Sequence, residues 1–352
     1  MTDLSLRKDG ACGRITLTRP QALNALSWDM CLRIEAALDR WRTDPQVALV
    51  LIEGEGPRAF CAGGDIAEVY HRARAGDVAH AQGFWRDEYR LNAKMAEYPK
   101  PLVSFLHGFV MGGGVGLGGH CAPRIVGETA QVAMPECGIG FVPDVGGSFL
   151  LARAPGRLGR HLALTAARMG PGDAIHAGFA DVFVPEAGWE ALKTGLARTG
   201  DVGLVAQAAE PPPPSPMAEA QARIDALYAG ADVAAIAAAL ERSEDPLAPA
   251  ALKALRRNSP LSMAVTLAML DALQAAPHDL RAALRQEYRV AHRILDQGDM
   301  LEGVRAAIID KDRSPRWADA FGAVPQDKVA ALLAPLGAEE LALPAPDGGE
   351  TE

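Results

Sequence analysis

Hydrophobic and polar positions change their spacing about halfway along the chain. In the first half, short apolar runs typical of strands alternate with helical patterns, and the predicted strands are residues 13–18, 47–52, 101–106, 125–126 and 131–134. After the first of them, Ser27 can cap a helix whose apolar residues recur at helical spacing, namely Met30, Ile34, Leu38 and Trp41. Residues 47–52 (VALVLI) are all apolar, as in a strand that is buried on both faces. Strands separated by helices in this way predict parallel βαβ units.

The second half, from about residue 155, is rich in Ala and Leu at helical spacing. Predicted helices cover residues 158–165, 218–227, 233–242, 249–257, 264–273 and 280–295. Four successive prolines in EPPPPSP (210–216) cannot lie within a helix and predict a stiff connector. We therefore expect an α/β core (1–205), a proline-rich linker (206–217), a helical C-terminal region (218–342) and a disordered tail (343–352).

Composition narrows the class of protein. The chain has 352 residues, of which 49% are apolar, and it can bury a large core without disulfides or metal. Its 44 acidic and 35 Lys and Arg residues give a net charge of −9, which argues against a nucleic-acid partner. The first residues lack the apolar stretch typical of a signal peptide, and no apolar run has membrane-spanning length, so we expect neither feature. The five scattered cysteines indicate reduced, buried thiols, and we expect a cytoplasmic protein.

Two glycine-rich turns carry candidate backbone chemistry. The first is MGGGVGLGG (111–119), in which Gly114, Gly116 and Gly119 match GxGxxG, with Glu136 twenty residues beyond Gly116, as in a dinucleotide site. The second is AFCAGGDI (59–66), which follows a predicted buried strand. Two such turns can each aim one N–H at the same carbonyl oxygen and form an oxyanion hole. The residues alone leave open a dinucleotide site, an oxyanion hole and two merely structural turns.

Three carboxylates are candidates for proton transfer or substrate contact. Glu136 and Asp144 lie in the mostly apolar segment MPECGIGFVPDVGG (134–147), where burial would raise the pKa of a carboxyl. Asp144 also has the spacing of an ordinary turn-former. Glu88 lies in FWRDEYRLN (84–92), where helical spacing alone favours the solvent-exposed face. The histidines, including His107 and His120, form no metal-binding pair, and no GxSxG motif indicates a serine hydrolase.

The order of these motifs resembles that of the crotonase (enoyl-CoA hydratase/isomerase) superfamily. The segments that carry the likeness are ITLTRPQALNALS (15–27), AFCAGGDI, PKPLVSFLHGFVMGGGVGL (99–117) and MPECGIGFVPDVGG. FWRDEYRLN, RRNSPLSM (256–263), QEYRVAHRIL (286–295) and EGVRAAIIDKDRSPRW (302–317) favour its branch of 3-hydroxyisobutyryl-CoA hydrolases, thioesterases of valine degradation. The resemblance implies an α/β fold built as a spiral of ββα units, followed by a helical C-terminal region.

The resemblance also implies roles for individual residues. Gly64 and Gly113 correspond to the two oxyanion-hole residues, and Glu136 to the catalytic carboxylate. Asp144, also placed among the catalytic residues, and Glu88 correspond to residues that contact the substrate. Hydratases of the superfamily carry a glutamate where this chain has Gly116, which disfavours hydration.

The resemblance further implies what the enzyme binds. No metal or separate cofactor is expected, because CoA is part of the substrate. Arg19, Lys311 and Arg313 are weaker candidates for contact with the CoA nucleotide. Two alternatives stay open: another acyl-CoA reaction of the superfamily, either hydration or isomerisation, and a non-catalytic acyl-CoA-binding protein. The sequence also leaves open two arrangements: a homo-oligomer, and a C-terminal region that covers its own active site.

Overall fold

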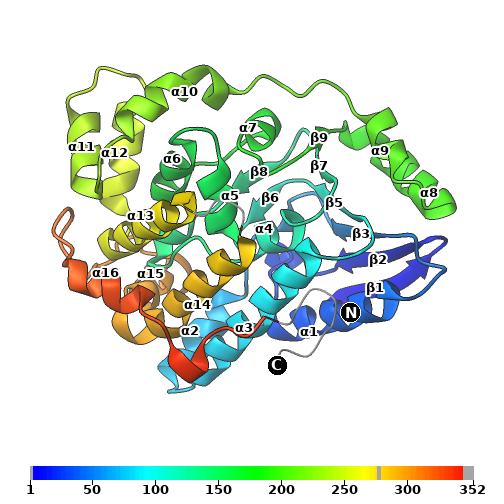
Figure 1. The fold of residues 1–352 in the computed structure, drawn as a ribbon, viewed down its shortest axis with the longest axis horizontal. Helices are drawn as coiled ribbons and strands as arrows, with labels where there is room; N and C mark the ends of the chain where they lie inside the picture. The colour runs from blue at the N-terminus through cyan, green and yellow to red at the C-terminus, as the bar shows by residue number, and fades with distance from the viewer. Residues whose placement is uncertain (1–2, 276–278, 344–352) are drawn as a thin grey trace.

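The computed structural model describes residues 3–275 and 279–343, and its strands form two sheets (Figure 1). The larger sheet has the strand order β1–β2–β3–β5–β7–β9, in which β1 and β2 are antiparallel and all other neighbours are parallel. Its strands are Leu4–Asp9, Cys12–Leu17, Leu49–Gly54, Leu102–Leu106, Arg124–Val126 and Val182–Phe183. The predicted strands at 13–18, 47–52, 101–106 and 125–126 are therefore confirmed as β2, β3, β5 and β7.

The smaller sheet consists of three parallel strands, each three residues long. They are β4 (Ala59–Cys61), β6 (Phe109–Met111) and β8 (Gln131–Ala133), in that spatial order. The chain passes from the large sheet to the small sheet three times, through β3–β4, β5–β6 and β7–β8, and a helical segment follows each pair. This repetition is the spiral of ββα units that the family resemblance implies.

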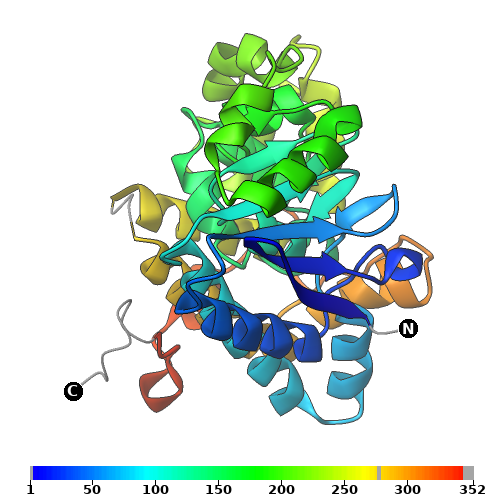
Figure 2. The same cartoon turned by 90° about the vertical axis from the view of Figure 1, so that its right-hand side faces the viewer.

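Helices surround both sheets. Those of the first part of the chain are α1 (Trp28–Arg42), α2 (Ile66–Arg74), α3 (Val78–Ala96), α4 (Gly113–Gly118), α5 (Gly147–Arg153), α6 (Leu158–Thr165), α7 (Pro171–His176), α8 (Trp189–Thr199) and α9 (Gly203–Ala208). Ser27 caps α1 as predicted, because its hydroxyl accepts from the N–H of Met30 at 3.3 Å. In Figure 2, α1 lies beside the N-terminal strands at one end of the molecule. Short 3₁₀ turns occupy Pro20–Ala22, Glu136–Ile139, Glu186–Gly188 and Gly337–Glu339.

The C-terminal half is helical, as predicted. Its helices are α10 (Pro216–Leu227), α11 (Val233–Glu241), α12 (Ala248–Arg257), α13 (Pro260–Ala275), α14 (Leu280–Gln297), α15 (Met300–Val304), a π-helical turn η4 (Arg305–Ile309) and α16 (Gln326–Leu333). The proline-rich segment crosses from α9 to α10 along one side of the molecule (Figure 1). No helix within the described residues is long and apolar enough to cross a bilayer.

One hydrophobic cluster joins the two halves of the chain. It includes Val50 and Ile52 of β3 together with apolar residues of α10 to α16, and it reaches Leu343. A second, smaller cluster packs α8 and α9 on the opposite face of the large sheet, against Leu49 and Leu51 of the same strand. Strand β3 is therefore buried on both faces, as its continuous apolar run predicts. Of the predicted tail, Leu343 is buried, and residues 344–352 lie outside the described residues.

A buried carboxylate fastens the C-terminal region to the loop that precedes α5. Glu287 on α14 is fully buried and accepts the N–H of Gly146 at 2.7 Å, the N–H of Ser148 at 3.0 Å and the hydroxyl of Ser148. Burial raises the pKa of Glu287 to about 8, an effect that these hydrogen bonds oppose. The position of residues 144–148 thus depends on a side chain from the far end of the sequence.

Replacing Glu287 with Ala leaves the buried N–H groups of Gly146 and Ser148 without an acceptor. Each buried donor without a partner costs on the order of 1–3 kcal/mol, so we expect the free energy of unfolding to fall by about 3 kcal/mol. Urea denaturation of both proteins measures this difference. Asp296→Ala, at an exposed position on the same helix, serves as the control and should unfold like the parent protein. Equal midpoints for Glu287→Ala and the control would contradict the fastening role.

Candidate active site

The small sheet brings three separate turns to one place. Because β4, β6 and β8 are parallel, their carboxyl ends lie side by side and lead into residues 62–64, 112–114 and 134–136. A cavity of about 200 Å³ opens among these turns. Ile308, from the C-terminal π-helical turn, completes its lining, which also includes Ala62, Gly63, Gly64, Ile66, Phe84, Trp85, Glu88, Gly112, Gly113, Pro135, Glu136, Ile139, Phe141 and Asp144.

Gly64 and Gly113, the two candidate oxyanion-hole residues, both line this cavity. Two hydrogen bonds form the β-bridge between Leu26 and Gly64: the N–H of Leu26 donates to the carbonyl of Gly63, and the N–H of Asp65 donates to the carbonyl of Leu26. The N–H of Gly64 takes no part in this bridge. Gly113 is the first residue of α4, where an N–H has no acceptor within the helix. A Cβ atom on Gly113 would lie 3.2 Å from the nitrogen of Gly64, so the two turns are in direct contact.

Two carboxylates lie against the glycines of this tract. At Gly112, whose φ is +48°, a Cβ atom would lie 2.7 Å from Oε1 of Glu136. At Gly113, it would lie 2.9 Å from Oε1 of Glu88. Both contacts are shorter than real Cβ atoms make, so a side chain at either position would displace a carboxylate. The tract therefore allows Glu88 and Glu136 to approach the backbone closely.

The three predicted carboxylates are all buried. Glu88, Glu136 and Asp144 are 3%, 5% and 5% exposed. Within the described residues, Oε1 of Glu88 and Oε2 of Glu136 are buried and have no hydrogen-bond partner. Asp144 accepts the hydroxyl of Tyr89 at 2.7 Å. Buried polar atoms ordinarily have partners, so the two orphaned oxygens indicate that a ligand or water completes this site.

Burial of the three carboxyl groups and repulsion between their negative charges raise their pKa values. Burial, together with the negative charge of Asp144, raises the pKa values of both Glu88 and Glu136 well above their ordinary range. Burial also raises the pKa of Asp144 to about 7, although the hydroxyl of Tyr89 favours its anion. Carboxyls with raised pKa values can exchange protons near neutral pH, which is the property of general acids and bases.

The structure brings Gly64, Gly113, Glu88, Glu136 and Asp144 together in this one cavity, although they come from four segments of the sequence. The interpretation of Glu88 from helical spacing alone was wrong, because its side chain faces the cavity rather than solvent. Asp144 is both a turn residue and part of the cavity, since its carbonyl also accepts the N–H of Gly147.

The GxGxxG glycines have a different explanation. A Cβ atom on Gly114 would lie 2.1 Å from the carbonyl oxygen of Cys61, and one on Gly119 would lie 2.7 Å from the carbonyl oxygen of Val115. At Gly116 the closest atoms would belong to Val145 and Asn92. Close packing therefore accounts for all three glycines, and the dinucleotide hypothesis loses its support.

The remaining candidates lie outside the cavity. Arg19 pairs with Asp65 at 3.0 Å, and Lys311 is exposed. Arg313 lines a second cavity. His107 and His120 bond backbone carbonyls at 2.7 Å, as core histidines do. No group of three potential metal ligands occurs within residues 3–275 and 279–343.

Sequence reasoning missed residues that support the site. Tyr89 lies within FWRDEYRLN, beside Glu88, and its buried hydroxyl holds Asp144. Trp85 and Phe141 stack with their ring centroids 5.3 Å apart and form an aromatic wall of the cavity. The sequence signal that could have identified Tyr89 and Trp85 was their position close to the candidate carboxylate Glu88. The helical pattern around Glu287 does not indicate that its side chain binds Gly146 and Ser148, which lie far away in the sequence.

Comparison with known proteins agrees with this architecture. Residues 12–333 match the family model of enoyl-CoA hydratase/isomerase. The chain is 35% identical over 353 residues to a protein of Gallus gallus named 3-hydroxyisobutyryl-CoA hydrolase, mitochondrial, covering 97% of this chain and 91% of that protein.

Solved structures give the same fold. A structure titled as an enoyl-CoA hydratase from Rhodobacter sphaeroides 2.4.1 superposes with a TM-score of 0.93 at 56% identity, covering 97% of this chain and all of that chain. One titled as a carnitinyl-CoA dehydratase from Mycobacterium thermoresistibile gives 0.92 at 42% identity, covering 97% and 99%. The chain belongs to the enoyl-CoA hydratase/isomerase family, the crotonase superfamily that its sequence motifs indicate.

Proposed function

We propose that this protein hydrolyses acyl-CoA thioesters and that its substrate is 3-hydroxyisobutyryl-CoA. The observation that carries the proposal is that Gly64, Gly113 and Glu136, with its unpartnered carboxylate oxygen, line one small cavity. The names of the curated relatives support the same activity.

The two N–H groups would stabilise the transition state. Attack on a thioester carbonyl builds negative charge on its oxygen, and two preorganised donors meet that charge without reorganisation. The donors belong to turns that touch each other, and the small sheet fixes both. A single donor of this kind typically contributes roughly 10²–10³ in turnover.

Glu136 would supply the attacking group. As its anion it either removes a proton from water or attacks the carbonyl to form a mixed anhydride, which water then cleaves. In the first route the proton that Glu136 removes from water passes to the departing thiolate of CoA. In the second route CoA leaves as its thiolate, and the water that cleaves the anhydride supplies the proton and regenerates the Glu136 anion. The raised pKa of Glu136 makes its anion a stronger base once the proton has been lost.

Asp144 and Glu88 would bind the polar end of the acyl group. Both lie among the apolar walls of Trp85 and Phe141, where an unmatched polar group is costly. A 3-hydroxyl group on the substrate provides a partner there. A site built to bind a hydroxyl discriminates against analogues that lack it.

Hydration is the second candidate, because two similar solved structures carry the titles of a hydratase and a dehydratase. The glutamate that hydratases of the superfamily place two residues after the glycine run is Gly116 here. A Cβ atom at this position would lie 2.8 Å from Cβ of Val145 and 2.9 Å from Nδ2 of Asn92, so no carboxylate fits without rearrangement. The packing around Gly116 therefore favours hydrolysis.

The proposed reaction needs no metal or separate cofactor, because CoA is part of the substrate and the attacking group belongs to the protein. We propose that one copy of the chain is sufficient for the site, a proposal supported by Ile308 of the same chain, which contributes to the cavity lining. We also propose a reducing, cytoplasmic environment, which the five buried, free cysteines support; the curated relatives are named mitochondrial.

Glu136→Gln keeps the shape of the side chain but removes its basicity. Release of free CoA thiol from (S)-3-hydroxyisobutyryl-CoA should fall by roughly 10²–10⁴-fold, with little change in the affinity for isobutyryl-CoA. Glu190→Gln, at an exposed position, is the control. Retained turnover would rule out Glu136. If the parent protein releases no thiol but hydrates an enoyl-CoA, the hydratase candidate takes its place.

Asp144→Ala should reduce discrimination between hydroxylated and plain acyl groups. We expect the ratio of kcat/KM for 3-hydroxyisobutyryl-CoA to that for isobutyryl-CoA to fall by about tenfold, which corresponds to the loss of one hydrogen bond to a charged group. Glu88→Gln tests the other carboxylate in the same assay. An unchanged ratio in Asp144→Ala together with a reduced one in Glu88→Gln would transfer this role to Glu88.

The pH dependence of kcat/KM should reflect the raised pKa of Glu136. Because the anion is the active form, activity rises with pH through that pKa, and the acid limb should have its midpoint well above the ordinary value of 4.5. Asp144→Asn removes a negative charge that opposes ionisation of Glu136, so the midpoint should move to lower pH. Asp296→Asn should leave it in place. A midpoint that stays or rises in Asp144→Asn would contradict this coupling.

A further inference from the structure

The C-terminal region reaches the active-site cavity through a single side chain. Among the described residues that line this cavity, Ile308 alone comes from the part of the chain after Asp144. It belongs to the π-helical turn η4, which follows α15 directly. π-Helical turns are rare and are found frequently at functional sites, so the position of Ile308 is a candidate for a functional role.

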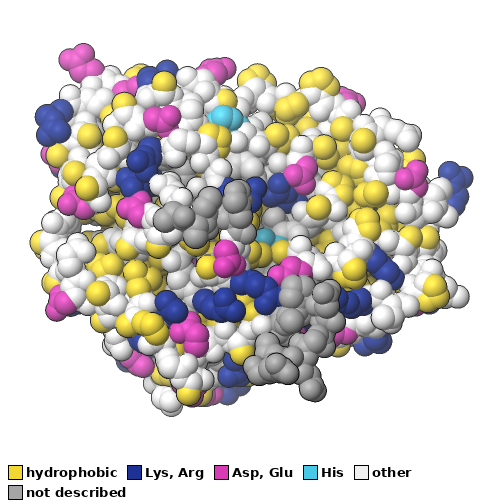
Figure 3. Space-filling view, in the orientation of Figure 1, with side chains coloured by type: hydrophobic (Ala, Val, Ile, Leu, Met, Phe, Trp, Pro, Cys, Tyr) yellow, Lys and Arg dark blue, Asp and Glu magenta, His cyan; other side chains and the backbone are white. Residues whose placement is uncertain are grey.

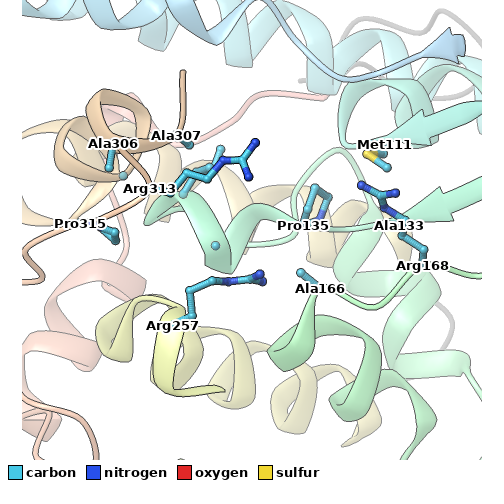
Figure 4. A pocket seen from close by; sticks show the side chains of 13 residues that line it. Met111, Ala133, Pro135, Ala166, Arg168, Arg257, Ala306, Ala307, Arg313 and Pro315 are labelled. Carbon is cyan, nitrogen blue, oxygen red and sulfur yellow. The ribbon is translucent and has the colours of Figure 1, made fainter. Parts of the chain in front are cut away.

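The neighbouring residues of the same turn face a different space. Ala306 and Ala307 line the second cavity, of about 380 Å³, as Figure 4 shows. Ile308 lines the active-site cavity and is not among the residues that line the second one. The turn η4 therefore separates the two cavities and presents its large side chain to the one that contains the reacting groups.

The cavity that Ile308 lines is small and has apolar walls. Its volume is about 200 Å³, and its other large apolar side chains include Ile66 from α2 and Phe84 and Trp85 from α3. The turn η4 also contacts α2. An acyl group that enters this cavity is therefore enclosed between α2 and α3, from the core, and η4, from the far end of the sequence.

An ion-pair cluster around Arg305 holds η4 in its place. Charges of both signs are interspersed on the protein surface, as one face shows in Figure 3. Around η4 they are instead arranged about one guanidinium group, because Arg305 pairs with Glu302 at 2.8 Å and with Asp310 and Asp312 at 2.7 Å. Glu302 precedes the turn and the two aspartates follow it, so the cluster joins both of its ends.

Backbone contacts hold the same segment against the turn that carries Glu136. The N–H of Asp310 donates to the carbonyl of Arg305 at 2.8 Å, which closes the π-helical turn. A Cβ atom on Gly303 would collide with the carbonyl of Ile139, so α15 packs directly on the 3₁₀ turn Glu136–Ile139. The distance between Ile308 and the attacking carboxylate is thus fixed by packed backbone.

We propose that Ile308 limits the size of the acyl group that this protein accepts and restricts it to short chains. A rigid, closely packed wall cannot move aside for an added methylene group without cost. Apolar pockets distinguish substrates that differ by one methylene by roughly 10–200-fold. The inference rests on the proposed acyl-CoA chemistry and gives the segment EGVRAAIIDKDRSPRW a role in it.

Substitution of Ile308 should change the preference for acyl length. Release of CoA thiol is measured with (S)-3-hydroxyisobutyryl-CoA and with 3-hydroxyhexanoyl-CoA, which keeps a hydroxyl group but is two carbons longer. In Ile308→Ala the wall recedes, so we expect the ratio of kcat/KM for the longer substrate to that for the shorter one to rise by about tenfold or more. Ile308→Val should shift the ratio in the same direction by a smaller factor.

Ile309→Ala is the matched control. It makes the same change at the next position of the same turn, where the side chain is also half-buried but does not line the cavity. Its ratio should equal that of the parent protein, and thermal melting confirms that each variant is folded. An unchanged ratio in both Ile308 variants, or an equal change in KM for both substrates, would overturn the size limit and leave hydrolysis intact.

Binding measurements separate the size limit from the hydrolase proposal. Ketone analogues of the two substrates, in which a methylene group replaces the thioester sulfur, cannot be hydrolysed and are titrated by calorimetry. If the protein releases no thiol, but Ile308→Ala improves the affinity for the longer analogue relative to the shorter one by about tenfold, the size limit stands while the hydrolase proposal fails. Equal relative affinities in the parent protein and Ile308→Ala would contradict the size limit, whatever the turnover.

Discussion

The parallel pairing of three very short strands is the constraint on which the site depends. β4, β6 and β8 contribute only three residues each, yet their pairing makes three distant segments end at the same edge. The turns that follow supply Gly64, Gly113 and Glu136. The large sheet and the helices hold this small sheet in place, and the C-terminal turn η4 closes the cavity from the other side.

The acidic cluster has an energetic consequence for the whole fold. Asp144 has a pKa of about 7 instead of 3.8, so folding disfavours its anion, and stability from this group is lost as pH rises between those values. Glu53 behaves in the opposite way. Burial alone would raise its pKa, but Arg14 and Lys193 lower it to about 2, so its contribution is present above pH 4.5 and lost toward pH 2. Asp144 and Glu53 thus respond oppositely to pH, and the raised pKa of Glu287 places it with Asp144.

The sequence predicts best the helices whose apolar residues recur over several turns and the strands that form a continuous apolar run. Helix α6 has the bounds that its periodicity predicts, and β3 is buried on both faces. Strands β4 and β6 were not predicted, because they lie in or directly before the two glycine-rich motifs that were interpreted as turns, whereas β8, of the same length, falls within the predicted strand at 131–134. Glu88 was misplaced by periodicity alone for a related reason: a helical pattern shows which side of α3 is polar but not what covers it. The family resemblance supplied its place, whereas Glu287 had no comparable signal.

The packing around Gly116 also bears on how activities can change within this fold. Val145 and the amide of Asn92 occupy the space that a side chain at position 116 would need. Val145 belongs to the loop that Glu287 secures, and its own φ is +53°. The side chain of a carboxylate introduced at position 116 by a single mutation would therefore clash with Val145 and Asn92. A carboxylate at position 116 would thus require coordinated changes in α3, in this loop and in α14, which secures the loop.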